Sequence, residues 1–313
     1  MAFDVALCVL VAGLALRLLT TRDLFEAVIL FVSFGLALAL VWVRIGAVDV
    51  ALAEVALGAG VTGALLVNAR RRLEQKAPEW LEAAHYRPAA AVLPALCGAF
   101  AGVAGLVALT APRAVQPLAP RILERVPDAA ATNPVTAVLL DFRAYDTLLE
   151  IGVLVAGITA VWALERGRPA VPPAATAEDE PVLAELVRWI VPLTVMTAIY
   201  LTWLGAYEPG GAFQAGALLA GAGVLMLASG FLRPYAPHSP VLRTVVAAGL
   251  FVFAAAALAT VFAEGALLRY PAAGGYVWVL AIEAVLTVSI AAILAEFFVD
   301  VPSAPQQASG EQR

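Results

Sequence analysis

The sequence predicts an all-α integral membrane protein with about nine transmembrane helices. Of the 313 residues, 62% are hydrophobic and 14% are charged, and the mean hydropathy is +0.90. Soluble domains carry about a quarter charged residues, so this composition is typical of a polytopic membrane protein. The sequence lacks the alternating pattern of barrel strands, which leaves helices as the expected spanning structure.

Windows of about twenty apolar residues, the length that crosses a bilayer, locate the predicted helices. Their bounds are 2–19, 23–43, 47–67, 88–109, 146–165, 183–204, 210–230, 240–263 and 275–299. With the N-terminus outside, the inner side holds 13 of the Lys and Arg residues and the outer side holds six. Because basic residues collect on the cytoplasmic side, we expect a multi-pass protein of the inner membrane with a cytoplasmic C-terminus.

Composition also excludes several functional classes. The net charge of -5 argues against binding of nucleic acid, which calls for a basic patch. Cys8 and Cys97 lie in separate apolar runs, and this predicts neither a disulfide framework nor a thiolate metal site. His85 and His238 fall in distant loops. We therefore expect no metal, no cofactor and no enzymatic activity.

A stretch rich in proline, alanine and acidic residues, RGRPAVPPAATAEDEP, interrupts the apolar pattern and is typical of a flexible cytoplasmic linker. It separates five predicted helices from four, and the polar C-terminal tail has the composition of a disordered segment. The predicted parts are a five-helix module at 1–165 (about 1–75 and 76–165), a linker at 166–181, a four-helix module at 182–299 and a tail at 300–313.

The stretch GAGVTG, from Gly58 to Gly63, has the letters of a dinucleotide-binding fingerprint. That fingerprint requires a strand before it and a helix after it, whereas this stretch lies inside a predicted membrane helix. We therefore predict no nucleotide site. Gly58 and Gly60 instead favour close helix packing or a local irregularity such as a π-bulge.

Two acidic residues stand in the third predicted span. Asp49 is at its start, where the helix dipole favours an acid. Glu54 lies further into the span, roughly 10 Å along the axis from its start. Because a glutamate at that depth is costly in lipid, we expect it to face protein or water and to serve the ion pathway.

A second charged group comes from the stretch LLDFRAYDTLLE. Asp146 is predicted to cap the fifth span, with Asp141 and Arg143 on an amphipathic interfacial segment before it. Glu150 follows Asp146 by one turn, and like charges at this spacing repel. Either Arg143 neutralises one acid, or one of them binds a proton or a cation. Capping and an ion pair leave Glu150 unexplained, so we hypothesise that it carries ions.

The rear module contributes a turn and another acid. Pro209 ends any preceding helix, and Gly210 and Gly211 permit either a tight re-entrant turn or a plain short connection. Glu283 falls near the middle of the last span, where a carboxylate is a functional candidate by default. No lysine or histidine occurs within a predicted span, so we expect part of an ion pathway rather than a complete proton pump.

Three motifs resemble ion-transport subunits. VWVRIGAVDVALAEVALGAGVTGALL, at 41–66, resembles a three-helix module of the large A subunit of Mrp-type sodium/proton antiporters. The same module occurs in membrane-bound hydrogenases and is similar to the J subunit of respiratory complex I. NPVTAVLLDFRAYDTLLEIGVLVAGITAVWAL, at 133–164, looks like the next A-subunit module. EPGGAFQAG, at 208–216, resembles the P-G-G-G-F-x-G-G signature of the four-helix Mrp B subunit.

The resemblance implies a fusion of A-subunit modules with a B subunit, in a complex with other membrane subunits that moves Na⁺ and H⁺. In the first module, Asp49 and Glu54 match the acidic pair. In the second, Glu150 matches the family's ion-translocating glutamate. Ala212 and Ala215 replace signature glycines, which leaves open whether a positive φ or a close approach is needed there. The remaining matches are Asp141, Phe142, Arg143, Asp146 and Thr147 in the second module and Pro209, Gly210, Gly211, Phe213 and Gly216 in the B-subunit signature.

Three functions are therefore considered. The leading one is an antiporter subunit in which Asp49, Glu54 and Glu150 line a half-channel that alternates between cation and proton. The second is an ion-translocating subunit of a membrane-bound hydrogenase or a complex I-like redox complex. The third is a structural scaffold without an ion path. Asp141, Arg143, Asp146 and Glu283 are further pathway candidates.

Overall fold

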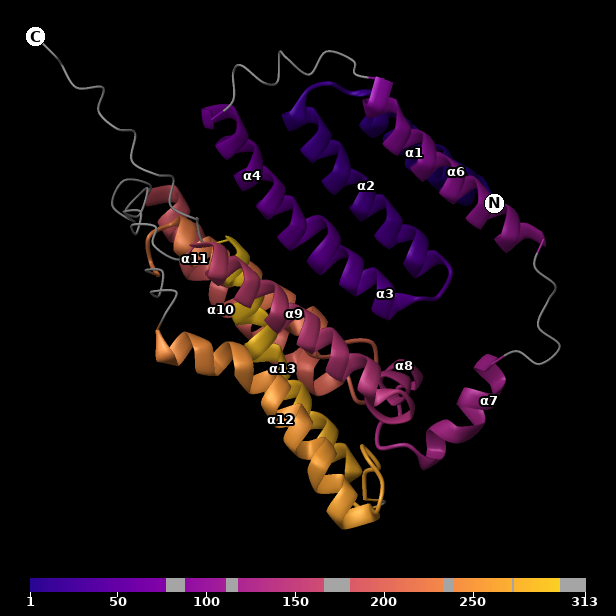
Figure 1. Cartoon of the computed structure of the whole chain (residues 1–313), viewed down its shortest axis with the longest axis vertical. Helices are drawn as coiled ribbons and strands as arrows, with labels where there is room; N and C mark the ends of the chain where they lie inside the picture. Colours follow the sequence, from indigo (N-terminus) through magenta and orange to yellow (C-terminus); the bar gives the residue numbers. More distant parts are fainter. Residues whose placement is uncertain (77–87, 111–117, 166–180, 233–238, 272, 299–313) are drawn as a thin grey trace, which may run out of the picture.

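A computed structural model describes residues 1–76, 88–110, 118–165, 181–232, 239–271 and 273–298 (Figure 1). Every regular element within these ranges is a helix, which confirms the predicted all-α class. Seven helices are long and apolar enough to cross a membrane, and two shorter apolar helices accompany them, at Ala95–Thr110 and Ala212–Leu227. The chain is a multi-pass membrane protein, and nine spans remain a prediction. The predicted tail and nearly all of the predicted linker lie outside the described residues.

The helices begin and end close to the predicted spans. In the first part of the chain they are α1 (Ala2–Thr20), α2 (Leu24–Arg44), α3 (Val48–Ala53), the π-helix η1 (Glu54–Val61), α4 (Thr62–Lys76), α6 (Pro88–Thr110) and α7 (Leu118–Arg125). The second part contains the 3₁₀ turn η2 (Val126–Asp128), α8 (Pro134–Ala137), the π-helix η3 (Val138–Phe142), α9 (Ala144–Glu165), α10 (Pro181–Leu204), α11 (Ala212–Ala228), α12 (Pro240–Glu264) and α13 (Gly275–Phe298).

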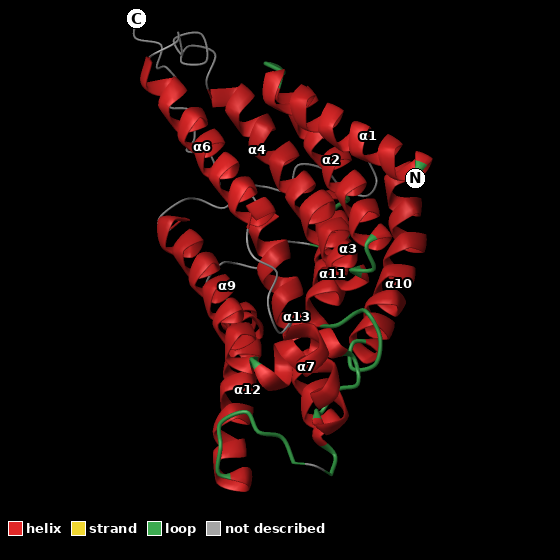
Figure 2. Ribbon diagram, turned by 90° about the vertical axis from the view of Figure 1, so that its right-hand side faces the viewer, coloured by secondary structure: helices red, strands yellow, loops and turns green. Residues whose placement is uncertain are grey.

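Two exposed ion pairs join α1 and α2 near the two ends of their hairpin. Near one end Arg44 pairs with Asp4 at 2.6 Å, and at the other Arg17 pairs with Glu26 at 2.5 Å. The Asp23 side chain caps α2 by accepting a hydrogen bond from the Glu26 backbone N–H at 2.8 Å. α2 then packs against the continuous helix formed by α3, η1 and α4 (Figures 1 and 2).

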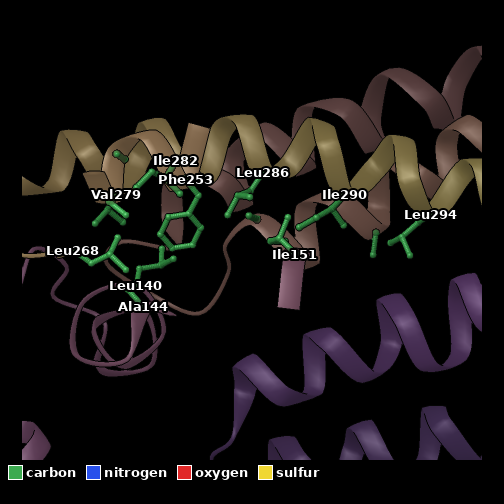
Figure 3. Packing of buried hydrophobic residues seen from close by; sticks show 14 of the residues in the cluster. Leu140, Ala144, Ile151, Phe253, Leu268, Val279, Ile282, Leu286, Ile290 and Leu294 are labelled. Carbon is green, nitrogen blue, oxygen red and sulfur yellow. The ribbon is translucent and has the colours of Figure 1, made fainter. Parts of the chain in front are cut away.

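The hydrophobic core surrounds α13, which packs against α9, α10, α11 and α12. Its buried side chains, among them Ile282, Leu286 and Ile290, meet Phe253 of α12 and Ile151 of α9 (Figure 3). A helix that is apolar on every side is expected in such a central position. α13 therefore fixes the arrangement of the rear module and carries Glu283 into the interior.

A side-chain hydrogen bond joins α9 to α13 at the end of the bundle away from Glu283. Trp162 Nε1 donates to Glu296 Oε1 at 3.2 Å, and both side chains are buried.

We expect Trp162→Phe to lower the free energy of unfolding by about 1 kcal/mol, because a buried acceptor loses a donor while the packing is largely kept. Heating the detergent-solubilised protein and measuring the folded fraction by gel filtration tests this, with Trp189→Phe on exposed α10 surface as the control.

Candidate functional site

The connection between α10 and α11, residues 205–211, is a tight turn whose two ends are buried in the protein. The backbone N–H groups of Gly205 and Gly211 both donate to the carbonyl oxygen of Leu201, at 3.1 and 2.9 Å. Gly205, Gly210 and Gly211 are buried. Gly211 has φ +107° and ψ -175°, a region that is essentially restricted to glycine. The turn is therefore tight and its glycines are buried, and its re-entrant character stays a prediction.

Asp49, in the first part of the chain, contacts this turn. Asp49 is the second residue of α3, and its Oδ1 accepts a hydrogen bond from the backbone N–H of Gly210 at 3.0 Å. Its backbone oxygen accepts from Gln214 Nε2 of α11 at 3.4 Å. The carboxylate therefore does more than favour the start of its own helix, because it binds the Gly210 end of the turn.

Residues 132–136, in the segment before α9, donate hydrogen bonds to the other side of the turn. The Thr136 hydroxyl donates to the Gly205 carbonyl oxygen at 2.5 Å, and the backbone N–H groups of Thr132 and Asn133 donate to that of Ala206. Asn133 is 3% exposed and caps α8 through its side-chain oxygen. Its amide lies beside the Asp49 carboxylate, and Nδ2 has no other hydrogen-bond partner among the described residues. The turn is thus enclosed by residues from distant parts of the sequence.

Glu283 of α13 lies against the turn from within the bundle. A Cβ on Gly211 would stand 2.8 Å from its Oε1, and one on Gly205 would stand 3.2 Å from it. The backbone N–H of Ala212, the first residue of α11, faces the carboxylate, a favourable place for an acid. The side chain is 3% exposed, and Oε2 has no hydrogen-bond partner among the described residues. Glu283 is the ninth residue of α13, the same place that it has in the predicted span.

The geometry of this turn explains two departures from the B-subunit signature. Ala212 and Ala215 are buried helical residues, and Leu268 is the one non-glycine residue of the described part with positive φ. The special backbone conformation belongs to Gly211, and a close approach belongs to Gly216, where a Cβ would stand 2.8 Å from Ile290. Alanine is therefore tolerated at 212 and 215.

Two buried hydroxyl groups extend the polar region along α13. Thr287 donates to the backbone oxygen of Glu283 at 2.8 Å, and its Oγ1 lies 3.0 Å from that of Thr202 on α10. Both threonines are less than one-tenth exposed. Hydroxyl groups at this depth are the kind of polar side chain that joins membrane helices.

Glu54 occupies a separate slot between α2 and η1. Its Oε1 would stand 2.5 Å from a Cβ on Gly58 and 3.2 Å from one on Gly35. Two glycines, one on each helix, therefore make room for the carboxylate. Glu54 is also the first residue of the π-helix, an irregularity that often marks functional sites.

The structure corrects the predicted role of Asp146. α9 begins at Ala144, so Asp146 lies in its first turn instead of capping it, and its carboxylate pairs with Arg143 at 2.5 Å. The segment before α9 is helical and buries Leu140 against the core, and its predicted place at the membrane interface stays a prediction. Glu150 is exposed one turn beyond Asp146. Among the described residues, no hydrogen bond links the Glu150 carboxylate to Asp49 or to Glu54.

Asp141 stabilises the connection before α8. Its Oδ2 accepts a hydrogen bond from the Ala130 backbone N–H at 2.8 Å. Burial raises the pKa of the Asp141 carboxyl, and burial together with the charge of Asp141 raises the pKa of the Tyr270 hydroxyl. Asp141 thus belongs to a loop contact near Tyr270.

Sequence reasoning missed several members of this junction. Gly205, Thr202 and Thr287 stand in ordinary apolar contexts, and no sequence signal distinguishes them. Asn133 begins the second of the three motifs, but only the structure places its amide beside Asp49.

Comparisons with known proteins agree with this architecture. Family models for the D and E subunits of MBH, named MbhD and MbhE, match residues 9–75 and 85–180. A model described as "Domain related to MnhB subunit of Na+/H+ antiporter" matches residues 182–299. Asp49 and Glu54 thus lie in the first domain, Asn133 and Glu150 in the second, and the turn with Glu283 in the third.

Three similar proteins extend the comparison. A probable A/B subunit of a K(+)/H(+) antiporter from Rhizobium meliloti (strain 1021) is 31% identical over 130 residues, which are 34% of this chain and 13% of that protein. A chain of the Mrp complex from Dietzia sp. DQ12-45-1b shares the fold with a TM-score of 0.75 and 24% identity, over 100% of this chain and 36% of that one.

A chain of the archaeal membrane-bound sulfane sulfur reductase has a TM-score of 0.52 and 22% identity, over 68% of this chain and 96% of that one. At these sequence identities, the two structures support a shared fold and nothing more specific. This chain spans 13% of the Rhizobium protein and 36% of the Dietzia chain. The matched domains, in their order along the sequence, identify the chain as a member of the Mrp-type antiporter family in which MbhD-type and MbhE-type domains are fused to an MnhB-type domain.

Proposed function

We propose that the chain is a membrane subunit of a multi-subunit monovalent cation/proton antiporter, supplies carboxylates to its ion pathway and catalyses no chemical reaction. The three domain matches support this function, as do the relatives that are named as part of a K(+)/H(+) antiporter and of an Mrp complex. The transported cation in this proposal is Na⁺ or K⁺, and the remaining transport machinery comes from further membrane subunits.

The observation that carries the proposal is the position of Glu150. It is exposed on α9, within a segment apolar enough to span the membrane, between Leu149 and Val153, which are 65% and 71% exposed. Arg143 is engaged by Asp146. A carboxylate that faces lipid is costly, so Glu150 has to bind a proton, a cation or a donor from a neighbouring subunit.

The other acidic candidates fall into groups in this proposal. Glu150 faces outward, where another subunit completes the pathway, with Asp146 and Arg143 beside it. Glu54 occupies its glycine slot on η1, and Asp49 and Glu283 meet at the turn. Asp141 takes part through the loop that encloses the same junction.

Replacement of Glu150 tests the function. We expect Glu150→Gln to remove most of the cation/proton exchange, measured with a pH-sensitive dye in everted vesicles, because an amide cannot take up and release the ion. Glu264→Gln, at the exposed end of α12, is the matched control and keeps full exchange. Undiminished exchange by Glu150→Gln at normal abundance of the complex would favour the scaffold role.

The isolated position of one apolar helix supports a partnered subunit. On α6, Phe100, Leu106 and Leu109 are 76%, 61% and 88% exposed, and α6 stands apart from α1 in Figure 2. We propose that other membrane subunits cover such surfaces. The N-terminus lies outside and the C-terminus inside in this proposal, and labelling of cysteines placed in opposite loops with an impermeant reagent tests the orientation.

A redox complex is the second candidate, because two of the matching models describe MBH subunits and one fold relative belongs to an archaeal respiratory complex. Purification in mild detergent separates the candidates. Iron–sulfur absorption in the purified complex would favour the redox function, and small antiporter subunits without it would favour the antiporter.

A further inference from the structure

We infer that Glu283 and Asp49 are the two ends of a proton relay that crosses the turn 205–211 and connects the MnhB-type domain with the MbhD-type domain. This inference rests on the proposed function and deepens it, because it adds an internal route between domains. Among the described residues, no hydrogen bond or ion pair joins either residue to Glu150, so we treat the relay as distinct from the outward-facing glutamate.

Glu283 has the surroundings of a proton-binding group. Its side chain is 3% exposed, its Oε2 lacks a hydrogen-bond partner, and none of the ion pairs of the described residues includes it. A buried charge without a counter-ion is costly, whereas a proton removes the charge and converts the unpartnered oxygen into a donor. A carboxyl that can release that proton again is suited to a relay.

Asp49 is the acid that binds the turn from the MbhD-type domain. Glu283 Oε1 lies against Gly211, and Asp49 Oδ1 accepts from the preceding residue, Gly210. Tyr207 and Glu208, the titratable residues of the turn, are exposed. The two carboxyl groups therefore face one short turn from α13 and from α3.

Two amide side chains lie beside the same turn. Gln214 donates to the Asp49 backbone, and its Oε1 would lie 3.7 Å from a Cβ on Gly211. Asn133 presents a buried Nδ2 beside Asp49, and this atom has no other partner among the described residues. A buried amide donor next to one carboxyl and an unpartnered oxygen on the other are polar groups of the kind that bind a buried water. In the relay step the O–H bond of the Glu283 carboxyl breaks, one forms on the Asp49 carboxylate, and no electrons are exchanged.

A purely structural role for Glu283, as an acceptor at the start of α11, makes a different prediction. A glutamine keeps an oxygen for the Ala212 N–H and nearly the same volume, so Glu283→Gln would then preserve both assembly and exchange. A relay instead requires the ionisable proton, so the same variant would assemble but lose exchange.

Infrared spectroscopy of the whole complex tests the proton directly. We expect the carbonyl stretch of a buried protonated carboxyl, lost in Glu283→Gln and retained in Glu296→Gln, the second buried acid of α13. After transfer to D₂O, deuteration of this group should slow by about tenfold or more in Asp49→Asn, as expected when a proton-transfer partner is removed. Glu264→Gln, at the exposed end of α12, should leave the rate unchanged.

The outcomes separate the relay from the proposed function. If the band is absent, or survives in Glu283→Gln, Glu283 does not hold the proton. If the band belongs to Glu283 but Asp49→Asn leaves its deuteration rate unchanged, the relay does not run through Asp49. Both results are independent of the exchange assay on Glu150→Gln, which tests the transport function itself.

Discussion

Replacement of Gly211 by alanine is expected to disrupt the junction of the three domains and to abolish most ion exchange. The backbone at φ +107° and ψ -175° is strained for any residue with a Cβ, at a cost of about 1–3 kcal/mol. The added Cβ would also stand 2.8 Å from Glu283 Oε1. We expect a lower unfolding temperature in detergent, measured by gel filtration after heating, and a lower yield of the assembled complex.

The control for this substitution is Gly221 on α11, the helix that follows the turn. A Cβ on Gly221 of α11 would have no atom within 4 Å, so Gly221→Ala should leave stability and exchange close to the parent. A double variant, Gly211→Ala with Glu283→Ala, removes the close contact but keeps the strained backbone. It should regain part of the stability and none of the exchange. Equal behaviour of Gly211→Ala and Gly221→Ala would show that the turn has no special conformation.

The helix boundaries could be predicted because membrane helices obey a simple length rule. The predicted span 275–299 and the observed α13, Gly275–Phe298, differ by one residue, and α2 and α12 agree similarly. Hydropathy reports where a segment enters and leaves the apolar layer. It carries no information on hydrogen-bond register within a helix, so η1 could only be left open and η3 was not predicted.

The wrong assignment of Asp146 has the same origin. The π-helix η3 ends at Phe142 and the helical path resumes at Ala144, earlier than the apolar window begins. A carboxylate expected to cap the helix therefore lies inside its first turn, where the nearest partner is Arg143. Capping rules presuppose a known first residue, and an irregular helix before it moves that residue.

The candidate site was only partly accessible to sequence reasoning. Single acids such as Asp49 and Glu283 stand out because charge is rare in apolar segments. Their common association with one turn depends on packing between domains that are far apart in sequence. Gly205 illustrates the limit: a Cβ there would stand 2.6 Å from the Gly211 Cα, yet its sequence context resembles any helix end.

Replacement of Gly58 by alanine is expected to lower exchange sharply with little loss of stability. Alanine favours a helix over glycine by about 1 kcal/mol, which offsets part of the disturbance. The new Cβ would stand 2.5 Å from Glu54 Oε1, so the carboxylate must leave the slot that Gly58 and Gly35 provide. If Glu54 serves the ion pathway from that slot, exchange in everted vesicles should fall to the level of Glu54→Gln.

Two comparisons make the Gly58 result specific to the carboxylate. Gly13→Ala in α1 adds a Cβ with no atom within 4 Å and should change neither exchange nor stability. Gly63→Ala would place a Cβ 2.7 Å from Val32 Cγ2, which disturbs packing of the same helix pair without touching Glu54. Because Gly58→Ala acts through Glu54, adding it to Glu54→Gln should reduce exchange no further. An additional loss in the double variant, or an equal loss in Gly63→Ala, would assign the effect to helix packing instead of the position of the carboxylate.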